Sequence, residues 1–274
     1  MSTTRSSAGE RGAARLLVTL LALLLTEASF SVPRRVAATG ALPGGTVAVA
    51  IGVQQSPGGT EAALPPSLSG PEAVRPFPTA SLVKLFLAEG VLHRARVGLE
   101  AVGERDRDRL RAMVRSSDDD AASAVWVRFG GPGLVTDVAA RYGLSGTAPP
   151  AVPGQWGRTT TTARDVAVFL SRLPVLAHPD DAAALLGWMA EVTPVAADGY
   201  DQRFGLLALP GTVAAKQGWM CCVAGMRHLH SAGVRDGRVV VLLSEVPAAI
   251  PEADARARLD TAAAALPEAA LLRC

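Results

Sequence analysis

The chain has 274 residues, of which 49% are hydrophobic, 19% are charged and 4% are aromatic. This is a globular composition with enough apolar residues for a substantial core, which excludes disorder, collagen and a coiled coil for the chain as a whole. The net charge is only +2, and so weak a basic excess with so few aromatic residues argues against nucleic-acid binding.

The N-terminal residues 1–31 are typical of a secretory signal or an N-terminal anchor. Arginines precede an apolar run at 16–25, which as a helix would span about 15 Å, too short for a bilayer core of about 30 Å. No cysteine precedes Cys221, so no lipobox is present in this segment. We predict export, to an extracellular or cell-envelope location, with residues 32–44 as a flexible linker.

Apolar runs and turn signals beyond the linker predict strands near both ends of the chain and helices between them. Strands are predicted at 46–53, 226–234 and 238–246, the last two joined by a turn at Asp236-Gly237. Helices are predicted from Ala80 onward and at 104–115, 120–129, 164–173 and 252–272, with a loop at 143–162.

This order of elements predicts one α+β domain over 45–274. Its α+β part would comprise 45–80 and 210–274, an antiparallel sheet flanked by helices, and its inserted all-α part would comprise 81–209.

The helix predicted from Ala80 carries the first candidate site. Ser81 and Lys84 are three residues apart and therefore lie on one face, and every other residue in 82–88 is apolar. Burial lowers the pKa of a lysine, so its amine becomes a candidate base for a nearby serine, a role that arginine cannot take. Only two of the 27 basic residues are lysines, Lys84 and Lys216. The structural alternative is an N-cap serine and a lysine that reaches the surface.

Two further segments combine polar and small residues. The sequence SSDDD at 116–120 precedes a predicted helix, where its side chains would serve simply as caps. The sequence KQG at 216–218 ends an apolar run typical of a strand, and its glycine lets a ligand approach the backbone. The structural alternative for Lys216 is an edge-strand position before a turn.

These three segments in this order, Ser-x-x-Lys, Ser-Asp-x before a helix and Lys-x-Gly on a strand, resemble the penicillin-recognising serine enzymes. The resemblance is strongest to class A β-lactamases and their relatives among penicillin-binding proteins, and it extends from about Thr46 to the final helix. It implies the β-lactamase/DD-peptidase fold and an exported serine hydrolase without a cofactor or metal. Its substrate would be a β-lactam or a peptidoglycan stem peptide, and we expect a monomer.

The resemblance also implies catalytic roles. Ser81 would be the acylated nucleophile and Lys84 its activating amine, while Ser117 would relay a proton to the leaving nitrogen. The backbone N–H groups of Ser81 and Trp219 would form the oxyanion hole.

The remaining motif positions imply contacts with the substrate. Lys216 would hold the substrate carboxylate, and Gln217 stands in place of the usual threonine or serine. Gly218 would keep the strand open beside Trp219. Asp119 stands where the family usually has asparagine; it cannot donate amide hydrogen bonds, and beside Lys84 it would favour the ammonium.

A second departure concerns deacylation. The family's Ω-loop glutamate would fall near Ser145 and its partner asparagine near Pro149, but residues 138–164 contain no Asp or Glu. The interval from Ser81 to Ser117 is also short for a class A enzyme, which implies a trimmed helical part. Because residues 138–164 lack a glutamate to activate water, we expect slow deacylation.

Cysteines and histidines point to no cofactor. Cys221 and Cys222 are adjacent and on a strand would face opposite ways, so only one of them can readily pair with Cys274; that disulfide and free buried cysteines both remain open. His228 and His230 share one strand face, but no carboxylate or third histidine lies near them in the sequence, so we predict no zinc.

Two functions from different classes follow. The first is a serine hydrolase of the β-lactamase/DD-peptidase type. The second is a catalytically idle protein of the same fold that binds cell-envelope components, which Asp119 and Gln217 favour and the retained Ser81, Lys84 and Lys216 oppose. The sequence has no H-E-x-x-H, Walker A or G-x-S-x-G motif to support another enzyme class.

Overall fold

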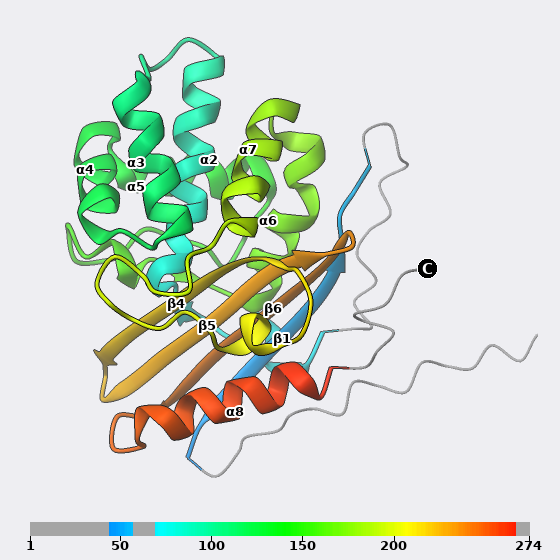
Figure 1. Cartoon of the computed structure of the whole chain (residues 1–274). Coiled ribbons are helices and arrows are strands. Elements are labelled where there is room, and N and C mark those ends of the chain that lie inside the picture. The colour runs from blue at the N-terminus through cyan, green and yellow to red at the C-terminus, as the bar shows by residue number, and fades with distance from the viewer. Residues whose placement is uncertain (1–43, 57–68, 267–274) are drawn as a thin grey trace, which may run out of the picture. The chain divides into compact units, whose positions relative to one another are not determined.

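The computed structural model describes residues 44–56 and 69–266 (Figure 1). The predicted signal segment, the linker up to residue 43 and Cys274 lie outside the described residues. The remaining chain forms a sheet with helices on both of its faces.

The sheet is antiparallel and has the strand order β1-β6-β5-β4. Its strands are β1 (Thr46–Val53), β4 (Ala214–Val223), β5 (Met226–Arg235) and β6 (Arg238–Pro247). The first strand pairs with the last, Thr46 opposite Glu245, so the chain closes on itself and brings both ends of the domain into one sheet. β4 is left at an edge, next to the helical layer.

Alternating side chains of β1 serve two separate cores. Val47, Val49 and Ile51 pack in the cluster that includes Leu259 of α8 (Glu252–Ala264), whereas Ala48 and Ala50 face the opposite cluster, built from the other helices. Because helices cover both faces, the strand is almost continuously apolar, as predicted from its composition. The turn at Asp236-Gly237 has φ values of 49° and 76°, the left-handed pair that tight hairpins require.

The other helices surround α2, whose residues from Val83 to Leu92 are all buried. Their bounds are α2 (Val83–Arg96), α3 (Glu104–Arg115), α4 (Asp119–Phe129), α5 (Gly131–Tyr142), α6 (Ala163–Leu176) and α7 (Pro179–Ala190). Short elements complete the described chain: the 3₁₀ turns η2 (Pro71–Val74), η3 (Ala80–Leu82), η4 (Trp156–Arg158) and η5 (Gly205–Ala208), and the paired strands β2 (Phe77–Pro78) and β3 (Thr160–Thr161). No helix among the described residues is both long and apolar enough to cross a membrane.

Two helices, α5 and α7, were not predicted. α5 opens with Gly131-Pro132-Gly133, which in sequence indicates a turn, but Gly130 at φ 64° ends α4 in the left-handed conformation and lets α5 start at once. α7 starts at Pro179 after His178, whose side chain accepts a hydrogen bond from the backbone N–H of Asp180. Both helices are stabilised by packing against α2.

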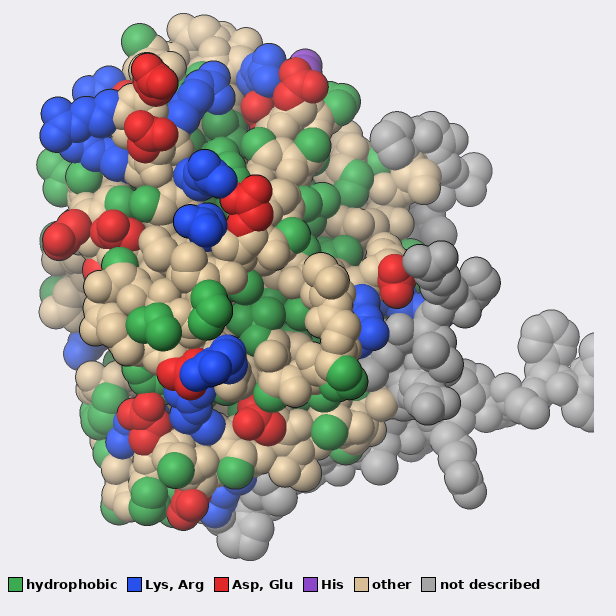
Figure 2. Space-filling view, in the orientation of Figure 1, with side chains coloured by type: hydrophobic (Ala, Val, Ile, Leu, Met, Phe, Trp, Pro, Cys, Tyr) green, Lys and Arg blue, Asp and Glu red, His purple; other side chains and the backbone are tan. Residues whose placement is uncertain are grey.

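Acidic and basic side chains are intermixed on the face seen in Figure 2. Ion pairs also join helices: Arg96 of α2 contacts Asp181 of α7 at 2.9 Å, and Arg94 contacts Asp137 of α5 at 3.1 Å. The Arg94–Asp137 pair is exposed, and exposed pairs contribute about 0–1 kcal/mol each, so apolar packing remains the main source of stability.

His228 and His230 are buried on one face of β5. The Nε2 of His230 lies 2.8 Å from the carbonyl oxygen of Pro78, and its Nδ1 accepts from the backbone N–H of Ser244 at 3.2 Å, which defines a neutral ring. Burial lowers the pKa of His228 to about 4 and that of His230 to about 3. Within the described residues, no three His, Cys, Asp or Glu side chains group together as metal ligands.

Because of these two buried histidines, we expect the folded state to lose stability in mild acid. A pKa that is lower in the folded state means that protons bind preferentially to the unfolded chain, so stability falls as the pH drops below 6.5 and continues to fall toward 4. Between pH 7 and pH 5 the loss should be on the order of 1–2 kcal/mol for each ring. Urea unfolding of His228→Gln should show a smaller pH dependence than the parent chain, whereas His93→Gln, at the half-buried end of α2, should not. Equal pH dependence in all three would contradict the assignment.

Candidate active site

Ser81 lies at the base of a cavity of about 370 Å³. It is 5% exposed and belongs to η3, the 3₁₀ turn that leads into α2, and its hydroxyl is not a helix cap because neither element has a side-chain cap. The cavity is also lined by Asp119, Trp219 and the segment 154–158. The N-cap alternative for Ser81 is therefore wrong.

Two of the four non-glycine residues with positive φ among the described residues belong to the candidate site. Ala80 has φ 46° and Ser117 has φ 53°, a conformation that L-residues other than Asn and Asp rarely adopt. Such strain persists only where the surroundings enforce it, and it is commonly found at functional sites. Here it positions the residue before Ser81 and the serine that contacts both lysines.

Lys84 is fully buried, so the surface-reaching alternative is also wrong. Its Nζ donates to the carbonyl oxygen of Ser117 at 2.6 Å, to Ser117 Oγ at 3.2 Å and to Asp119 Oδ1 at 2.5 Å. Asp118, between them, is the cap of α4 and accepts from Ala121 N–H at 2.8 Å. The SSDDD segment therefore both caps a helix and binds Lys84, through different residues.

Lys216 on β4 reaches the same serine from the other side. Its Nζ lies 2.8 Å from Ser117 Oγ and 2.7 Å from the carbonyl oxygen of Gln217, and the side chain is fully buried. Two lysine amines thus converge on one hydroxyl. We call Lys84, Lys216, Ser117 and Asp119 the amine cluster.

Burial controls the charge of the amine cluster. Desolvation lowers the pKa of Lys84, although the carboxylate of Asp119 acts in the opposite direction. Desolvation also lowers the pKa of Lys216, well below its ordinary value, and the neighbouring Lys84 charge lowers it further. Both amines are therefore much closer to a neutral, basic form than a surface lysine is.

Lys84 Nζ donates three hydrogen bonds, and none of them goes to the candidate nucleophile Ser81. In the part of the chain that the structure describes, no hydrogen bond joins Lys84 Nζ to Ser81 Oγ. For Lys84 to take a proton from Ser81, the ammonium must first lose a proton and release one of these partners. Asp119, with a side chain 60% exposed at the cavity, is the partner most free to move.

Two tryptophan rings lie over the lysines: Trp219, which was assigned from the sequence, and Trp156, which was not. The ring of Trp156, in the 154–158 segment, lies 5.0 Å from Lys84 Nζ, and its Nε1 donates to Ser123 Oγ at 3.2 Å. The ring of Trp219 lies 5.7 Å from Lys216 Nζ. Such contacts favour the cationic amine. The sequence feature that could have identified Trp156 is its place in a Gly-rich loop of a chain with few aromatic residues.

The two residues after Lys216, Gln217 and Gly218, contact other parts of the fold and do not line the cavity. The Gln217 side chain is fully buried and its Nε2 donates to the carbonyl oxygens of Gln202, at 3.1 Å, and Phe204, so it is not among the cavity-lining residues. A Cβ on Gly218 would lie 3.2 Å from the carbonyl oxygen of Thr79, so this glycine lets η3 pack closely on β4. In this geometry Gln217 cannot contact a ligand in the cavity.

The 154–158 segment brings no carboxylate to the cavity, because its lining residues are Gly154, Gln155, Trp156, Gly157 and Arg158. Among all the cavity-lining residues in the described part of the chain, Asp119 alone carries a carboxylate. It binds Lys84 rather than standing free beside Ser81.

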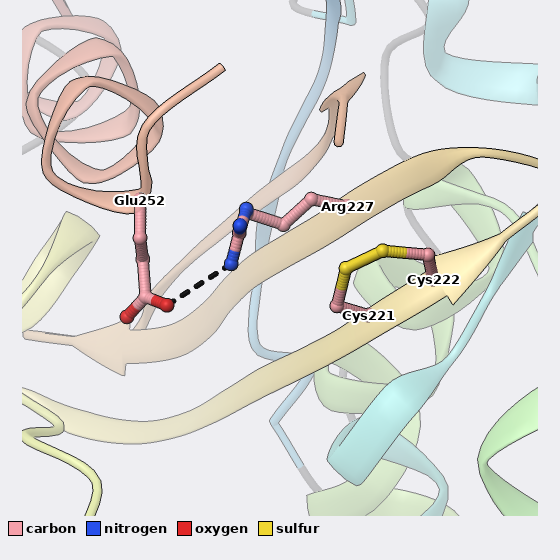
Figure 3. Close-up of a disulfide and its surroundings, with 4 residues drawn as sticks. All are labelled: Cys221, Cys222, Arg227 and Glu252. Atoms are coloured by element: carbon pink, nitrogen blue, oxygen red, sulfur yellow. Dashed lines mark hydrogen bonds and ion pairs between the residues drawn. A yellow bond between two sulfur atoms is a disulfide. The ribbon is translucent and has the colours of Figure 1, made fainter. Parts of the chain in front are cut away.

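The cysteines pair differently from the alternatives considered from sequence. Cys221 and Cys222 form a disulfide with each other, although adjacent strand residues were expected to face opposite ways (Figure 3). Both are exposed and line the cavity. Cys274 lies outside the described residues.

Comparisons with known proteins identify the fold. No family model matches the chain. The solved structures that resemble it include a β-lactamase from Sphaerobacter thermophilus (TM-score 0.60, 18% identity, covering 83% of this chain and 92% of that chain), a β-lactamase from Chitinophaga pinensis (0.63, 17%, 82% and 93%) and a variant of PBP-A in an acyl-enzyme complex with penicillin G (0.64, 17%, 83% and 90%). The described domain therefore has the fold of class A β-lactamases and PBP-A, and the predicted α+β fold is confirmed.

Sequence comparison adds a closer relationship. The chain is 38% identical over 196 residues to the protein named "Putative lipoprotein LppW" of Mycobacterium tuberculosis and of Mycobacterium bovis. The match covers 67% of this chain and 60% of LppW, so the chain spans less than two thirds of the length of these relatives.

The charge of the amine cluster can be measured directly, because the chain has only two lysines. In NMR spectra of chain labelled with ¹³C-lysine, both ε-methylene signals should titrate below the ordinary pKa of 10.5. Asp119→Asn should lower the pKa of Lys84 further, since the carboxylate that favours the ammonium is gone. Asp180→Asn, on the exposed start of α7, should change neither. A lysine that titrates at its ordinary value, or a Lys84 pKa raised by Asp119→Asn, would contradict this description.

Proposed function

We propose that this chain is an exported serine hydrolase of the β-lactamase/DD-peptidase type, which forms an acyl-enzyme on Ser81 with β-lactams or D-Ala-D-Ala-like amides. The observation that carries the proposal is the amine cluster, whose member Asp119 lines the same cavity as Ser81. The fold shared with β-lactamases, and with a PBP-A variant whose structure is an acyl-enzyme complex with penicillin G, supports it.

In the proposed acylation the neutral amine of Lys84 takes the proton of Ser81 Oγ, which attacks the amide carbonyl carbon. The C–N bond then breaks, and Ser117 passes its hydroxyl proton to the leaving nitrogen. Ser117 is suited to this role because its Oγ lies 3.2 Å from Lys84 Nζ and 2.8 Å from Lys216 Nζ, so its proton can be replaced from either amine. The backbone N–H groups of Ser81 and Trp219 would stabilise the oxyanion.

A negatively charged substrate fits the amine cluster. Among the described residues Lys84 is bonded to a carboxylate, that of Asp119, whereas Lys216 is bonded to Ser117 Oγ and the carbonyl oxygen of Gln217, so a substrate carboxylate near Lys216 would supply negative charge there. It would also favour the protonated form of Lys216. Gln217 is turned toward Gln202 and Phe204, so this contact falls to Lys216 and Ser117 in the proposal, and because both are buried and do not line the cavity, the wall in front of them must move for a substrate to reach them.

A location in the cell envelope or outside the cell is part of the proposal. The basic and apolar pattern of residues 1–31 supports export, and the relative LppW carries the name of a lipoprotein. Peptidoglycan stem peptides are found in that compartment.

The second candidate function is a catalytically idle envelope-binding protein of the same fold. The occupied hydrogen bonds of Lys84 favour it, because the amine is bound to Asp119 rather than to Ser81. Under this alternative the cavity would still take a ligand but no covalent bond would form.

A fluorescent penicillin separates the two functions. We expect covalent labelling of the parent chain, no labelling of Ser81→Ala, and labelling slowed by at least about 10²-fold in Lys84→Arg, because guanidinium does not act as a base. Ser56→Ala, at an exposed serine, should be labelled normally, and circular dichroism should show that all variants are folded. Labelling that survives in Ser81→Ala would overturn the assignment of the nucleophile, whereas an unlabelled parent chain would favour the binding protein.

The acyl-enzyme should be long-lived. Its hydrolysis needs an activated water, and segment 154–158 supplies no carboxylate to activate one. General-base catalysis typically contributes about 10²–10⁴-fold in rate, or roughly 3–5 kcal/mol. Intact-mass spectrometry after mixing with penicillin should show an adduct that persists while free product appears slowly after a burst. Rapid turnover without an adduct would mean that another group supplies the base.

A further inference from the structure

The Cys221–Cys222 disulfide is part of the cavity wall and has no role in the proposed acylation. Both cysteines line the cavity that contains Ser81, on the strand that carries Lys216 (Figure 3). Both are exposed. The sulfur atoms are therefore accessible to a reactant in solution, at the entrance to the candidate active site.

The pairing of β4 with β5 is irregular at these two cysteines. Met220 pairs with His228 and Val223 pairs with Met226, so the two cysteines together oppose the single residue Arg227. This two-against-one arrangement is a β-bulge, whose extra residue is unpaired in the ladder. β4 is also an edge strand, and within the described residues no further strand pairs with its other side. The disulfide is thus a local cross-link across an irregular part of the strand.

We propose that Cys221–Cys222 is a thiol–disulfide exchange site that takes a dithiol reductant at the cavity entrance. A thiolate of the reductant attacks one cysteine sulfur, the S–S bond breaks, and the other cysteine leaves as a thiolate that takes up a proton. The second thiolate of the reductant then attacks the mixed disulfide and releases the first cysteine. Two electrons pass to the protein, which gains two thiols, and the dithiol becomes a disulfide.

Reduction would change the shape of the cavity wall. Without the cross-link, adjacent strand residues are free to project to opposite faces, so one thiol would turn away from the cavity. Met220, the residue before the pair, packs close to the 154–158 segment, since a Cβ on Gly157 would lie 3.5 Å from its Cε. A change at the cysteines would therefore be passed to Met220 and its neighbour Trp219.

The exchange reaction can be tested without any substrate of the proposed enzyme. In full-length Cys274→Ser chain, only Cys221 and Cys222 remain as cysteines. Without reductant, iodoacetamide should add no label to the folded chain in intact-mass spectra, and after dithiothreitol it should add two. The tryptophan emission should shift on reduction, and Trp219→Phe should diminish that shift.

Two results would overturn the exchange site, and a third would contradict the proposed change of the cavity wall. Labelling without reductant would show that the pair is not a disulfide, and labelling that requires both dithiothreitol and denaturant would show that it is not accessible. A reduced chain with unchanged tryptophan emission would show that the wall does not respond.

The effect on catalysis rests on the proposed function. If the proposed function holds, the rate of fluorescent penicillin labelling should differ at least twofold between the oxidised and reduced forms. The double variant Cys221→Ala/Cys222→Ala should be labelled at the same rate with and without reductant. If no form is labelled by penicillin, the proposed function fails, while the alkylation experiment still decides the exchange site.

Discussion

Two lysine amines buried around a single serine hydroxyl are the constraint on which the site depends. A buried ammonium must satisfy its hydrogen bonds without water, so Lys84 and Lys216 need acceptors at fixed positions. Ser117 supplies two of them, through its Oγ and its carbonyl oxygen. The left-handed backbone at Ser117 and the absence of a Cβ at Gly218 follow from this need, because they let the turn, helix α2 and strand β4 meet closely.

The same burial makes the lysines chemically useful. Desolvation lowers both pKa values, whereas Asp119 and the rings of Trp156 and Trp219 favour the ammonium. Burial is the larger effect at Lys84, so the ion pair with Asp119 moderates its basicity without cancelling it. The exposed side of Asp119 faces the cavity, and a ligand entering there would therefore alter the charge balance behind Ser81.

Much of the fold could be predicted because apolar runs and turn residues mark β1, β5 and β6, and a charged segment marks α3, at or near their observed ends. The motif order also indicated which polar residues would meet: the structure brings Ser117 between Lys84 and Lys216.

What the sequence could not reveal depends on tertiary contacts. No local pattern states that Lys84 binds Asp119 rather than Ser81, that Gln217 turns toward the 202–204 segment, or that Trp156 covers the lysine.

The most direct measurement of the central claim is peptide mapping of the chain after reaction with penicillin. The account predicts the adduct on the Ser81 hydroxyl alone. An adduct on the amine of Lys84 or Lys216 would contradict it, because the lysines would then be nucleophiles rather than the groups that activate one.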